Sequence, residues 1–161
     1  MEEILEILEK DGRVSPEDIA KMLKKKPQDV KAAIKKYEKE GVIVKYKTVI
    51  NKDLIKEEDS SLRALIEVSI VPQKDAGFDK IAERIYSFPE VSSCYLISGT
   101  YDLLVIVEGK NIHTVSSFVA EKLSCLENVR GTTTHFLLKK YKEDGVILKQ
   151  KEENKRIAIS Y

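Results

Sequence analysis

Apolar residues between positions 62 and 138 switch repeatedly between two spacings, and this switching restricts the fold more than any other feature. Alternate apolar residues, or a short wholly apolar run, predict a strand, and an apolar residue at every third or fourth position predicts a helix. The predicted strands span 62–71, 91–98, 103–107 and 129–138, and the predicted helices span 78–85 and 115–123. This β-α-β-β-α-β order is that of the split βαβ, or ferredoxin-like, arrangement.

A sheet of this kind has two faces, and its two helices can cover only one of them. The predicted strands carry apolar residues on both faces; in the last strand Phe136 lies on one face and Leu137 on the other. The second face therefore needs a cover. A second copy of the same sheet is the simplest one, and it would give a symmetric homodimer.

The first fifty residues predict a separate unit built from short helices. Apolar residues at helical spacing predict helices over 2–10, 16–23 and 27–40. Ser15-Pro16-Glu17-Asp18 is a helix start, with a serine N-cap and proline in the first helical position. Residues 42–50 alternate like a β-hairpin. Three helices followed by such a hairpin predict a winged helix-turn-helix, so the whole chain is expected to be an α+β protein of two domains.

The lysines of this unit are concentrated in one segment. Residues 21–47 contain ten lysines against three acidic residues, a net charge of +7, whereas residues 1–19 carry −5 and the whole chain only +1. A local basic surface is typical of proteins that contact the phosphates of nucleic acids. A solvated, lysine-rich helix face would give the same pattern, so the charge alone leaves both interpretations open.

In a helix-turn-helix, the third helix enters the major groove of double-stranded DNA with its N-terminal residues against the base edges. Gln28 is therefore the candidate for recognising a base edge, and Lys31 could reach guanine or phosphate. The remaining candidate DNA contacts, which would position the protein on phosphates, are Lys24, Lys25, Lys26, Lys35, Lys36 and Lys47.

The loss of apolar periodicity after residue 50 predicts the domain boundaries. Residues 1–50 form the expected DNA-binding domain, 51–61 a polar linker, 62–140 the expected effector-binding and oligomerisation domain, and 141–161 a C-terminal strand or tail. Short strand-like pieces lie at 147–148 and 157–159 within that tail.

The compartment is predicted from what the chain lacks. Cys94 and Cys125 have no metal-type spacing, which favours two buried free thiols. No stretch approaches the roughly 20 apolar residues of a membrane span, and Met1-Glu2-Glu3 lacks the basic start of a secretory signal. We therefore expect a cytoplasmic protein with no membrane partner, metal or resident cofactor.

The segments Ile4–Arg13, Ser15–Ala20, Ile34–Ile43, Ser98–Leu103 and Val129–Thr134 occur in an order and spacing that span nearly the whole chain. In this respect the chain resembles the Lrp/AsnC family, the feast/famine regulators. It departs from that family in the turn before the third helix, where Lys24-Lys25-Lys26-Pro27 replaces the usual Ser or Thr cap.

The resemblance implies a sequence-specific transcriptional regulator whose second domain binds an amino acid or related small molecule. It also implies homodimers that assemble into tetramers or octamers. Gly99 would let backbone approach a ligand closely, and N–H groups of its turn could hold a carboxylate. An ordinary hairpin turn, with Asp102 bonded to its own backbone, is the alternative. The candidate effector-binding residues are Ser98, Gly99, Thr100, Tyr101, Asp102, Thr132 and Thr134.

Two other functions fit parts of the sequence. Some proteins with this domain pair resemble sirohaem decarboxylases, but tetrapyrrole chemistry needs convergent His or Arg groups, and the chain has only His113 and His135 as histidines. A ligand-binding assembly module without specific DNA binding is the second alternative, because the third helix displays lysines and no arginine. We expect no enzymatic activity.

Overall fold

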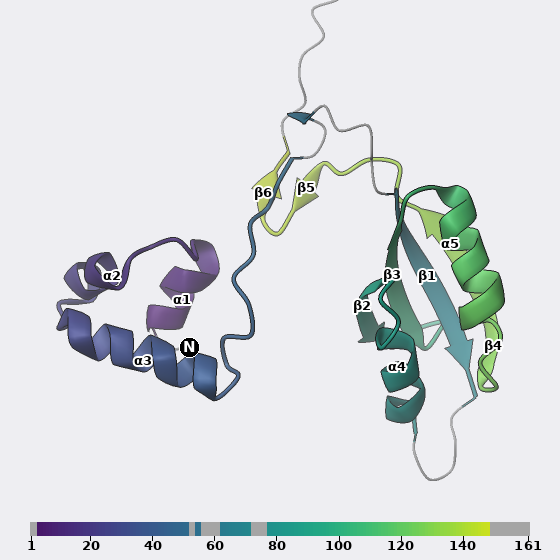
Figure 1. Cartoon of the computed structure of the whole chain (residues 1–161), viewed down its shortest axis with the longest axis horizontal. Helices are drawn as coiled ribbons and strands as arrows, with labels where there is room; N and C mark the ends of the chain where they lie inside the picture. Colours follow the sequence, from purple (N-terminus) through teal and green to yellow (C-terminus); the bar gives the residue numbers. More distant parts are fainter. Residues whose placement is uncertain (1–2, 52–53, 56–61, 72–76, 149–161) are drawn as a thin grey trace, which may run out of the picture. The chain divides into compact units, whose positions relative to one another are not determined.

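The computed structural model describes residues 3–51, 54–55, 62–71 and 77–148. The chain divides into two compact units, residues 1–50 and residues 51–161. Each unit has its own cluster of buried apolar residues, so each can be described by itself (Figure 1).

Residues 3–39 form three helices, as the periodicity predicted: α1 (Glu3–Lys10), α2 (Pro16–Leu23) and α3 (Pro27–Lys39). The start of α2 has the expected chemistry, because the Ser15 hydroxyl accepts a hydrogen bond from the Asp18 N–H at 3.1 Å. The helices enclose a small core of completely or nearly completely buried side chains, made of Ile4, Ile19, Ala20, Val30 and Tyr37.

The turn between α2 and α3 is short and sharply bent. Lys24 adopts the left-handed conformation, with φ of 53°, and the Lys25 N–H donates to the Ala20 carbonyl at 2.9 Å. This is the geometry in which helices usually end on glycine. Lys26 is the N-cap of α3 and makes no side-chain capping hydrogen bond. The N–H groups in the first turn of α3 therefore receive no hydrogen bond from the Lys26 side chain.

The β-hairpin expected over residues 42–50 is not formed, since that range contains no strand. The alternation of apolar residues there is real, but it gives only one extended segment. A hairpin needs a turn in its middle, and no glycine, proline, asparagine or aspartate lies between Val42 and Ile50. Without a pairing partner inside the unit, the ladder hydrogen bonds of a strand cannot form.

The second unit has the predicted β-α-β-β-α-β order (Figure 1). Its four-stranded sheet has the strand order β2-β3-β1-β4, and all three pairings are antiparallel. This order confirms the ferredoxin-like arrangement. Its elements are β1 (Leu62–Ile70), α4 (Asp79–Tyr86), β2 (Val91–Leu96), β3 (Leu103–Gly109), α5 (Ile112–Phe118), the π-helical turn η2 (Val119–Leu123) and β4 (Val129–Phe136).

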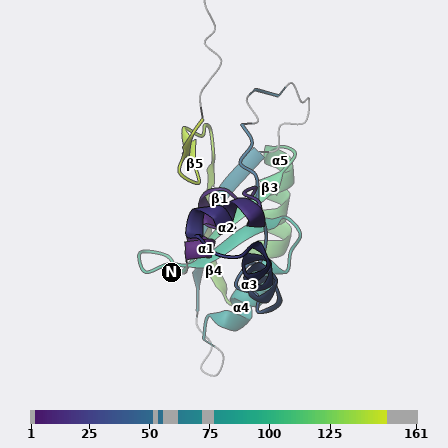
Figure 2. The same ribbon diagram turned by 90° about the vertical axis from the view of Figure 1, so that its left-hand side faces the viewer.

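One face of this sheet packs against α4, α5 and η2, and Figure 2 shows α5 beside β3. Alternate residues of β1 and β3 are buried there: Ala64, Ile66, Val68, Ile70, Leu103, Val105 and Val107. The intervening residues point to the opposite face, which no helix among the described residues covers; we call it the open face. Among them Leu65, Leu104 and Ile106 are apolar and only partly exposed.

A second, two-stranded sheet follows the fourth strand. β5 (Lys142–Glu143) and β6 (Val146–Ile147) pair through a tight turn in which Asp144 and Gly145 both have positive φ, 46° and 80°. Such a pair of angles is typical of a type I′ hairpin. The strand-like piece predicted at 147–148 overlaps this hairpin only at Ile147, and the piece predicted at 157–159 lies outside the described residues.

The expectation of two buried thiols is wrong. Cys94 in β2 is half-buried against the core, and burial raises the pKa of its thiol. Cys125 is exposed, because it lies in the turn after η2 and not within the packed part of a helix. No helix in the described part of the chain is long and apolar enough to span a membrane.

Candidate DNA-binding surface and effector site

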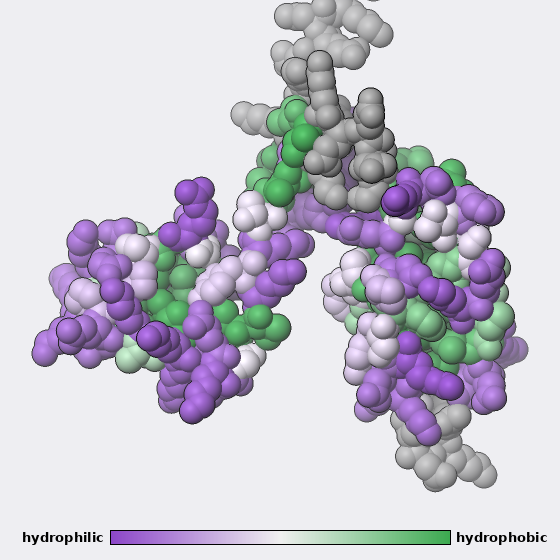
Figure 3. All heavy atoms as spheres, in the orientation of Figure 1, coloured by the Kyte–Doolittle hydropathy of each residue, from purple (hydrophilic) through white to green (hydrophobic). Residues whose placement is uncertain are grey.

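The exposed lysines of the first unit gather around the α2–α3 turn and along α3. Lys24, Lys25 and Lys26 form the turn, and Lys31, Lys35 and Lys36 project from α3; all six are exposed. Figure 3 shows hydrophilic side chains projecting along α3. We call these six lysines the lysine surface. The fold therefore brings together most of the cations that the sequence proposed as DNA contacts.

Three members of the lysine surface are paired with carboxylates. Lys31 lies 2.5 Å from Glu17 at the start of α2, measured from Nζ to Oε1, whereas Lys25 lies 3.7 Å from Glu3 and Lys36 lies 4.0 Å from Glu40. The other three, Lys24, Lys26 and Lys35, have no ion-pair partner within the described residues.

Gln28 occupies the second position of α3 and its side chain is exposed. The first turn of α3 carries the positive end of the helix dipole, and Lys26 provides no side-chain cap there. The amide of Gln28 is thus displayed at the positive end of a helix and beside three lysines.

Tyr46 ties the extended segment after α3 to the helices. Its hydroxyl donates to the Glu38 carboxylate at 3.1 Å, and burial together with that carboxylate raises the pKa of Tyr46. A Cβ at Gly12 would lie only 3.2 Å from the Tyr46 ring, so the glycine makes room for it. Lys47, the seventh proposed lysine contact, follows directly and is exposed, but it lies on this extended segment and not on α3.

The turn from Ser98 to Asp102 joins β2 to β3, and Asp102 makes three hydrogen bonds with nearby backbone groups. The Asp102 carboxylate accepts the Ile70 N–H at 2.8 Å, its N–H donates to Val68 at 3.1 Å, and its carbonyl accepts the Ile97 N–H at 2.8 Å. Asp102 therefore holds the turn against the end of β1. Only one of its carboxylate oxygens, Oδ2, takes part in the bond to Ile70.

Thr132 and Thr134 lie on β4, across β1 from that turn. Val68 pairs with Leu103 on one side and with Thr132 on the other, which places Thr132 at the same end of the sheet as the turn. Thr134 pairs with Ile66, two residues farther along. Both threonines point to the helix-covered face and are half-buried, and the Thr132 hydroxyl lies 3.4 Å from that of Ser124.

Gly99 is not required by the local geometry. Its φ lies outside the left-handed region, and an added Cβ would meet only the Ile97 side chain at 3.7 Å, an ordinary contact distance. Ser98, Gly99 and Thr100 are exposed, and Tyr101 is half-buried. The described chain thus leaves space beside Gly99.

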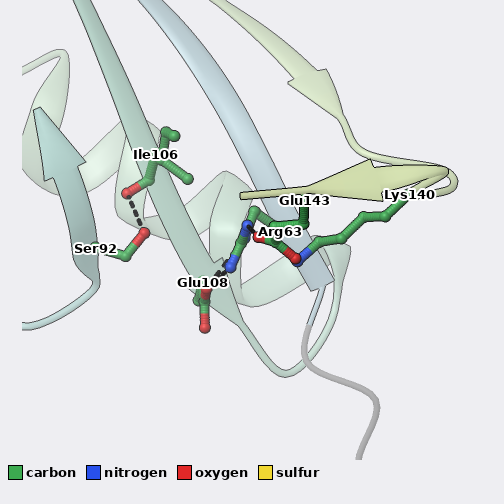
Figure 4. Close-up of polar contacts among 6 residues, drawn as sticks. All are labelled: Arg63, Ser92, Ile106, Glu108, Lys140 and Glu143. Carbon is green, nitrogen blue, oxygen red and sulfur yellow. Dashed lines mark hydrogen bonds and ion pairs between the residues drawn. The ribbon is translucent and has the colours of Figure 1, made fainter. Parts of the chain in front are cut away.

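Figure 4 shows an ion network on the open face that the sequence did not predict. Arg63 of β1 donates to Glu108 of β3 at 2.7 and 3.0 Å and to Glu143 of β5 at 2.6 Å, while Lys140 donates to Glu143 at 2.6 Å. Lys140 and Arg63 together lower the pKa of Glu143 to about 2. The Asp144-Gly145 dipeptide, a strong hairpin signal, could have revealed the hairpin that carries Glu143.

Two family sequence models match the chain. One describes a winged helix-turn-helix DNA-binding domain and matches residues 2–44; the other describes the Lrp/AsnC ligand binding domain and matches residues 63–147, more than half of the chain. The chain belongs to the Lrp/AsnC family. It is a DNA-binding transcriptional regulator with a small-molecule ligand-binding domain.

Relatives of this Lrp/AsnC protein include the HTH-type transcriptional regulator YugG of Bacillus subtilis (strain 168), which is 46% identical over 98% of this chain and 95% of its own length. The leucine-responsive regulatory protein of Haemophilus influenzae is 26% identical over 90% of this chain and 86% of its own. A transcriptional regulator of Neisseria meningitidis, solved as a complex with L-methionine, is 26% identical, with a TM-score of 0.67 over 87% of this chain and 88% of its own.

The relatives named here are transcriptional regulators, and none is named as a sirohaem decarboxylase.

Proposed function

We propose that the lysine surface, together with Lys47, binds the sugar-phosphate backbone of double-stranded DNA while Gln28 recognises a base edge in the major groove. The observation that carries this proposal is the clustering of exposed lysines around the α2–α3 turn and along α3, with Gln28 at the positive end of that helix. Phosphate contacts of this kind position a protein on DNA, whereas the contact of Gln28 with a base would specify the sequence.

The salt dependence of DNA affinity tests this docking. If each half-site neutralises ~4 phosphates, a dimer neutralises ~8, and log affinity falls with log salt at a slope near −7. Changing both Lys31 and Lys35 to Ala removes two of these charges per half-site and flattens the slope by roughly 1 for each lost contact. Lys110→Ala, which removes an exposed lysine of the second unit, is the matched control and leaves the slope unchanged.

Competition between a promoter fragment and bulk DNA at fixed salt tests sequence specificity. The proposal requires the promoter fragment to bind more tightly. Equal affinities would favour a ligand-binding assembly module without specific DNA binding.

We further propose that an amino acid binds beside the Ser98–Asp102 turn, with Thr132 and Thr134 as additional contacts. Gly99 supports this site, because nothing inside the described chain requires glycine there, while close approach of a ligand would. The N. meningitidis relative that was solved with L-methionine supports the ligand class.

A thermal-shift screen of the twenty amino acids tests this site. A ligand at 100 times its Kd adds about 2.7 kcal/mol to the free energy of unfolding, which gives a clear shift in Tm. Gly99→Ala is expected to fold normally and to lose the shift, because its methyl group occupies the space that the ligand would need. A shift that Gly99→Ala retains in full would place the effector elsewhere.

The open face is proposed to pair with the same face of a second copy, which gives a homodimer and, through further contacts, tetramers or octamers. Its partly exposed Leu65, Leu104 and Ile106 would be buried in this way. A pair of DNA-binding units then suits two half-sites separated by whole turns of duplex. We propose a cytoplasmic location, because a regulator of this kind must reach the DNA that it binds.

A further inference from the structure

We propose that Glu17 is a positioning residue: it holds Lys31 of α3 in an ion pair and so competes with DNA phosphate for that lysine. This inference rests on the proposed function, because it takes the lysine surface to be the part of the protein that meets DNA. Glu17 lies on α2 and outside the lysine surface, and its proposed effect is to weaken DNA binding.

The ion pair joins two helices that are fixed relative to one another. Glu17 lies in the first turn of α2 and Lys31 in the second turn of α3. Between these helices Ile19 and Val30 are both completely buried, at 0% exposure. Because this packing holds the two backbones, Lys31 and Glu17 stay within reach of one another, and Lys31 Nζ lies 2.5 Å from Glu17 Oε1 although both side chains are about half exposed.

The other paired lysines of the surface are held less closely. The ion pair of Lys25 with Glu3 measures 3.7 Å and that of Lys36 with Glu40 measures 4.0 Å, both beyond hydrogen-bond distance. The Lys31 ammonium, by contrast, lies within hydrogen-bond distance of the Glu17 carboxylate and lowers its pKa below the ordinary value.

A carboxylate beside Lys31 has two consequences for DNA binding. To reach a phosphate, Lys31 must first give up its bond to Glu17, which reduces the net gain from the contact. The Glu17 charge also remains near the duplex, so a docked Lys31 releases fewer counterions than a lysine with no acidic neighbour. Removing the carboxylate should therefore strengthen binding, which is unusual for a substitution at the edge of a recognition surface.

The first test uses Glu17→Gln in the full-length protein, with affinity for a mixed-sequence duplex measured by fluorescence anisotropy at several salt concentrations. We expect binding about two- to fivefold tighter, in the range of one exposed ion pair, and a salt slope steeper by up to about 1 per half-site. Glu9→Gln removes the same charge from an exposed position on α1 and is expected to change neither quantity.

A double-mutant cycle distinguishes two ways in which Glu17 could weaken DNA binding: by pairing with Lys31, or by repelling the DNA phosphates directly. In a Lys31→Ala background, Glu17→Gln should give little or none of its gain, because the lysine it would release is absent. An equal gain in both backgrounds, or no gain in the wild-type background, overturns the inference. Glu17→Asp, which keeps the charge but shortens the reach by one methylene, should give a smaller gain in the same direction.

The Lys35→Ala variant distinguishes loss of the proposed role of Glu17 from loss of the proposed DNA-binding surface. If Lys35→Ala leaves the salt slope unchanged, or no variant binds duplex, the lysine surface is not the DNA-binding surface. If Lys35→Ala flattens the slope and Glu17→Gln has no effect, only the role of Glu17 is lost. Thermal unfolding of each variant verifies that α2 remains folded.

Discussion

Asp102 connects the β2–β3 turn to the end of β1 through its carboxylate and its backbone. The sequence suggested two roles for it, a contact to an effector or a residue that satisfies nearby backbone. The bond from Ile70 shows that at least one carboxylate oxygen serves the backbone. A turn held in this way is a rigid platform, whichever molecule binds beside it.

Replacing Asp102 tests how much its carboxylate contributes to the stability of the fold. Asp102→Ala leaves the partly buried Ile70 N–H without its acceptor, so we expect the free energy of unfolding to fall by about 1–3 kcal/mol, measured by urea titration. Asp102→Asn is the matched control, because its amide oxygen can still accept that N–H. Stability unchanged in the alanine variant would contradict this role.

Gln28 is the residue on which sequence discrimination is proposed to depend. Gln28→Ala should reduce the difference in affinity between a selected target duplex and bulk DNA by about 1–3 kcal/mol if the amide makes a bidentate contact with a base. Lys35→Ala should instead weaken binding to both duplexes equally. A uniform loss in the Gln28 variant would mean that this side chain does not recognise a base.

At the scale of elements, the ion pair of Arg63 with Glu143 attaches the β5–β6 hairpin to β1 of the sheet, and Lys140, three residues before Glu143, pairs with the same carboxylate. The side chains of Arg63 and Glu143 are only 27% and 19% exposed, so solvent screens their contact less than it would a surface pair. Val146 and Ile147 of the same hairpin are exposed. The ionic contacts, more than apolar packing, therefore hold this element.

Glu143→Gln should loosen the hairpin. At neutral pH we expect the Leu148 amide, which donates to the Tyr141 carbonyl, to exchange its hydrogen faster by on the order of tenfold, as expected for the loss of a charge-assisted bond. Glu121→Gln removes an exposed charge of the same unit and serves as the control. Unaltered exchange at Leu148 would show that the ionic contacts do not hold the hairpin.

The same contact predicts a pH dependence. The pKa of Glu143 in the folded protein, about 2, lies below its ordinary value of 4.5. The ionised carboxylate therefore adds stability above about pH 4.5, and this stability is lost as the pH falls from 4.5 toward 2. Amide chemical shifts of the hairpin, followed by NMR through that range, should move in the wild type and stay nearly constant in Glu143→Gln.

At the scale of the whole molecule, the proposed dimer depends on the open face. Ile106→Arg places a charge on that face, and two-fold symmetry would bury it twice in a dimer, so we expect a monomer in sedimentation velocity. The isolated fold should survive, because Ile106 points away from the helix-covered core. Ile112→Arg makes the same change at an exposed position on α5 and should leave the assembly intact. A dimer formed by folded Ile106→Arg would contradict the proposed interface.

The helices, and the order of helices and strands along the chain, were predictable because their signals are local. Ser15 and Asp18 are three residues apart, and their mutual bonds define the start of α2 without help from distant residues. In the sheet, alternation along each strand separated the buried face of β1 from the open face. The family resemblance rested on the same local segments, and the comparisons confirmed it.

Contacts between distant residues were not predictable in this way. Arg63 meets Glu108 and Glu143 across 45 and 80 residues of sequence, and no spacing rule connects such positions. The pairing of Lys31 with Glu17 depends on how α2 packs against α3. The predicted hairpin over 42–50 failed for the related reason that alternation marks a strand but does not supply its partner.

The order of residues alone thus determined where helices start, which strand faces are apolar and where positive charge accumulates, because caps, periodicity and charge act within a few residues of chain. Which carboxylate meets which cation, and which backbone groups the Asp102 turn satisfies, was decided only by the tertiary structure. Those contacts form when packing brings distant segments within about 3 Å, a distance that no local pattern encodes.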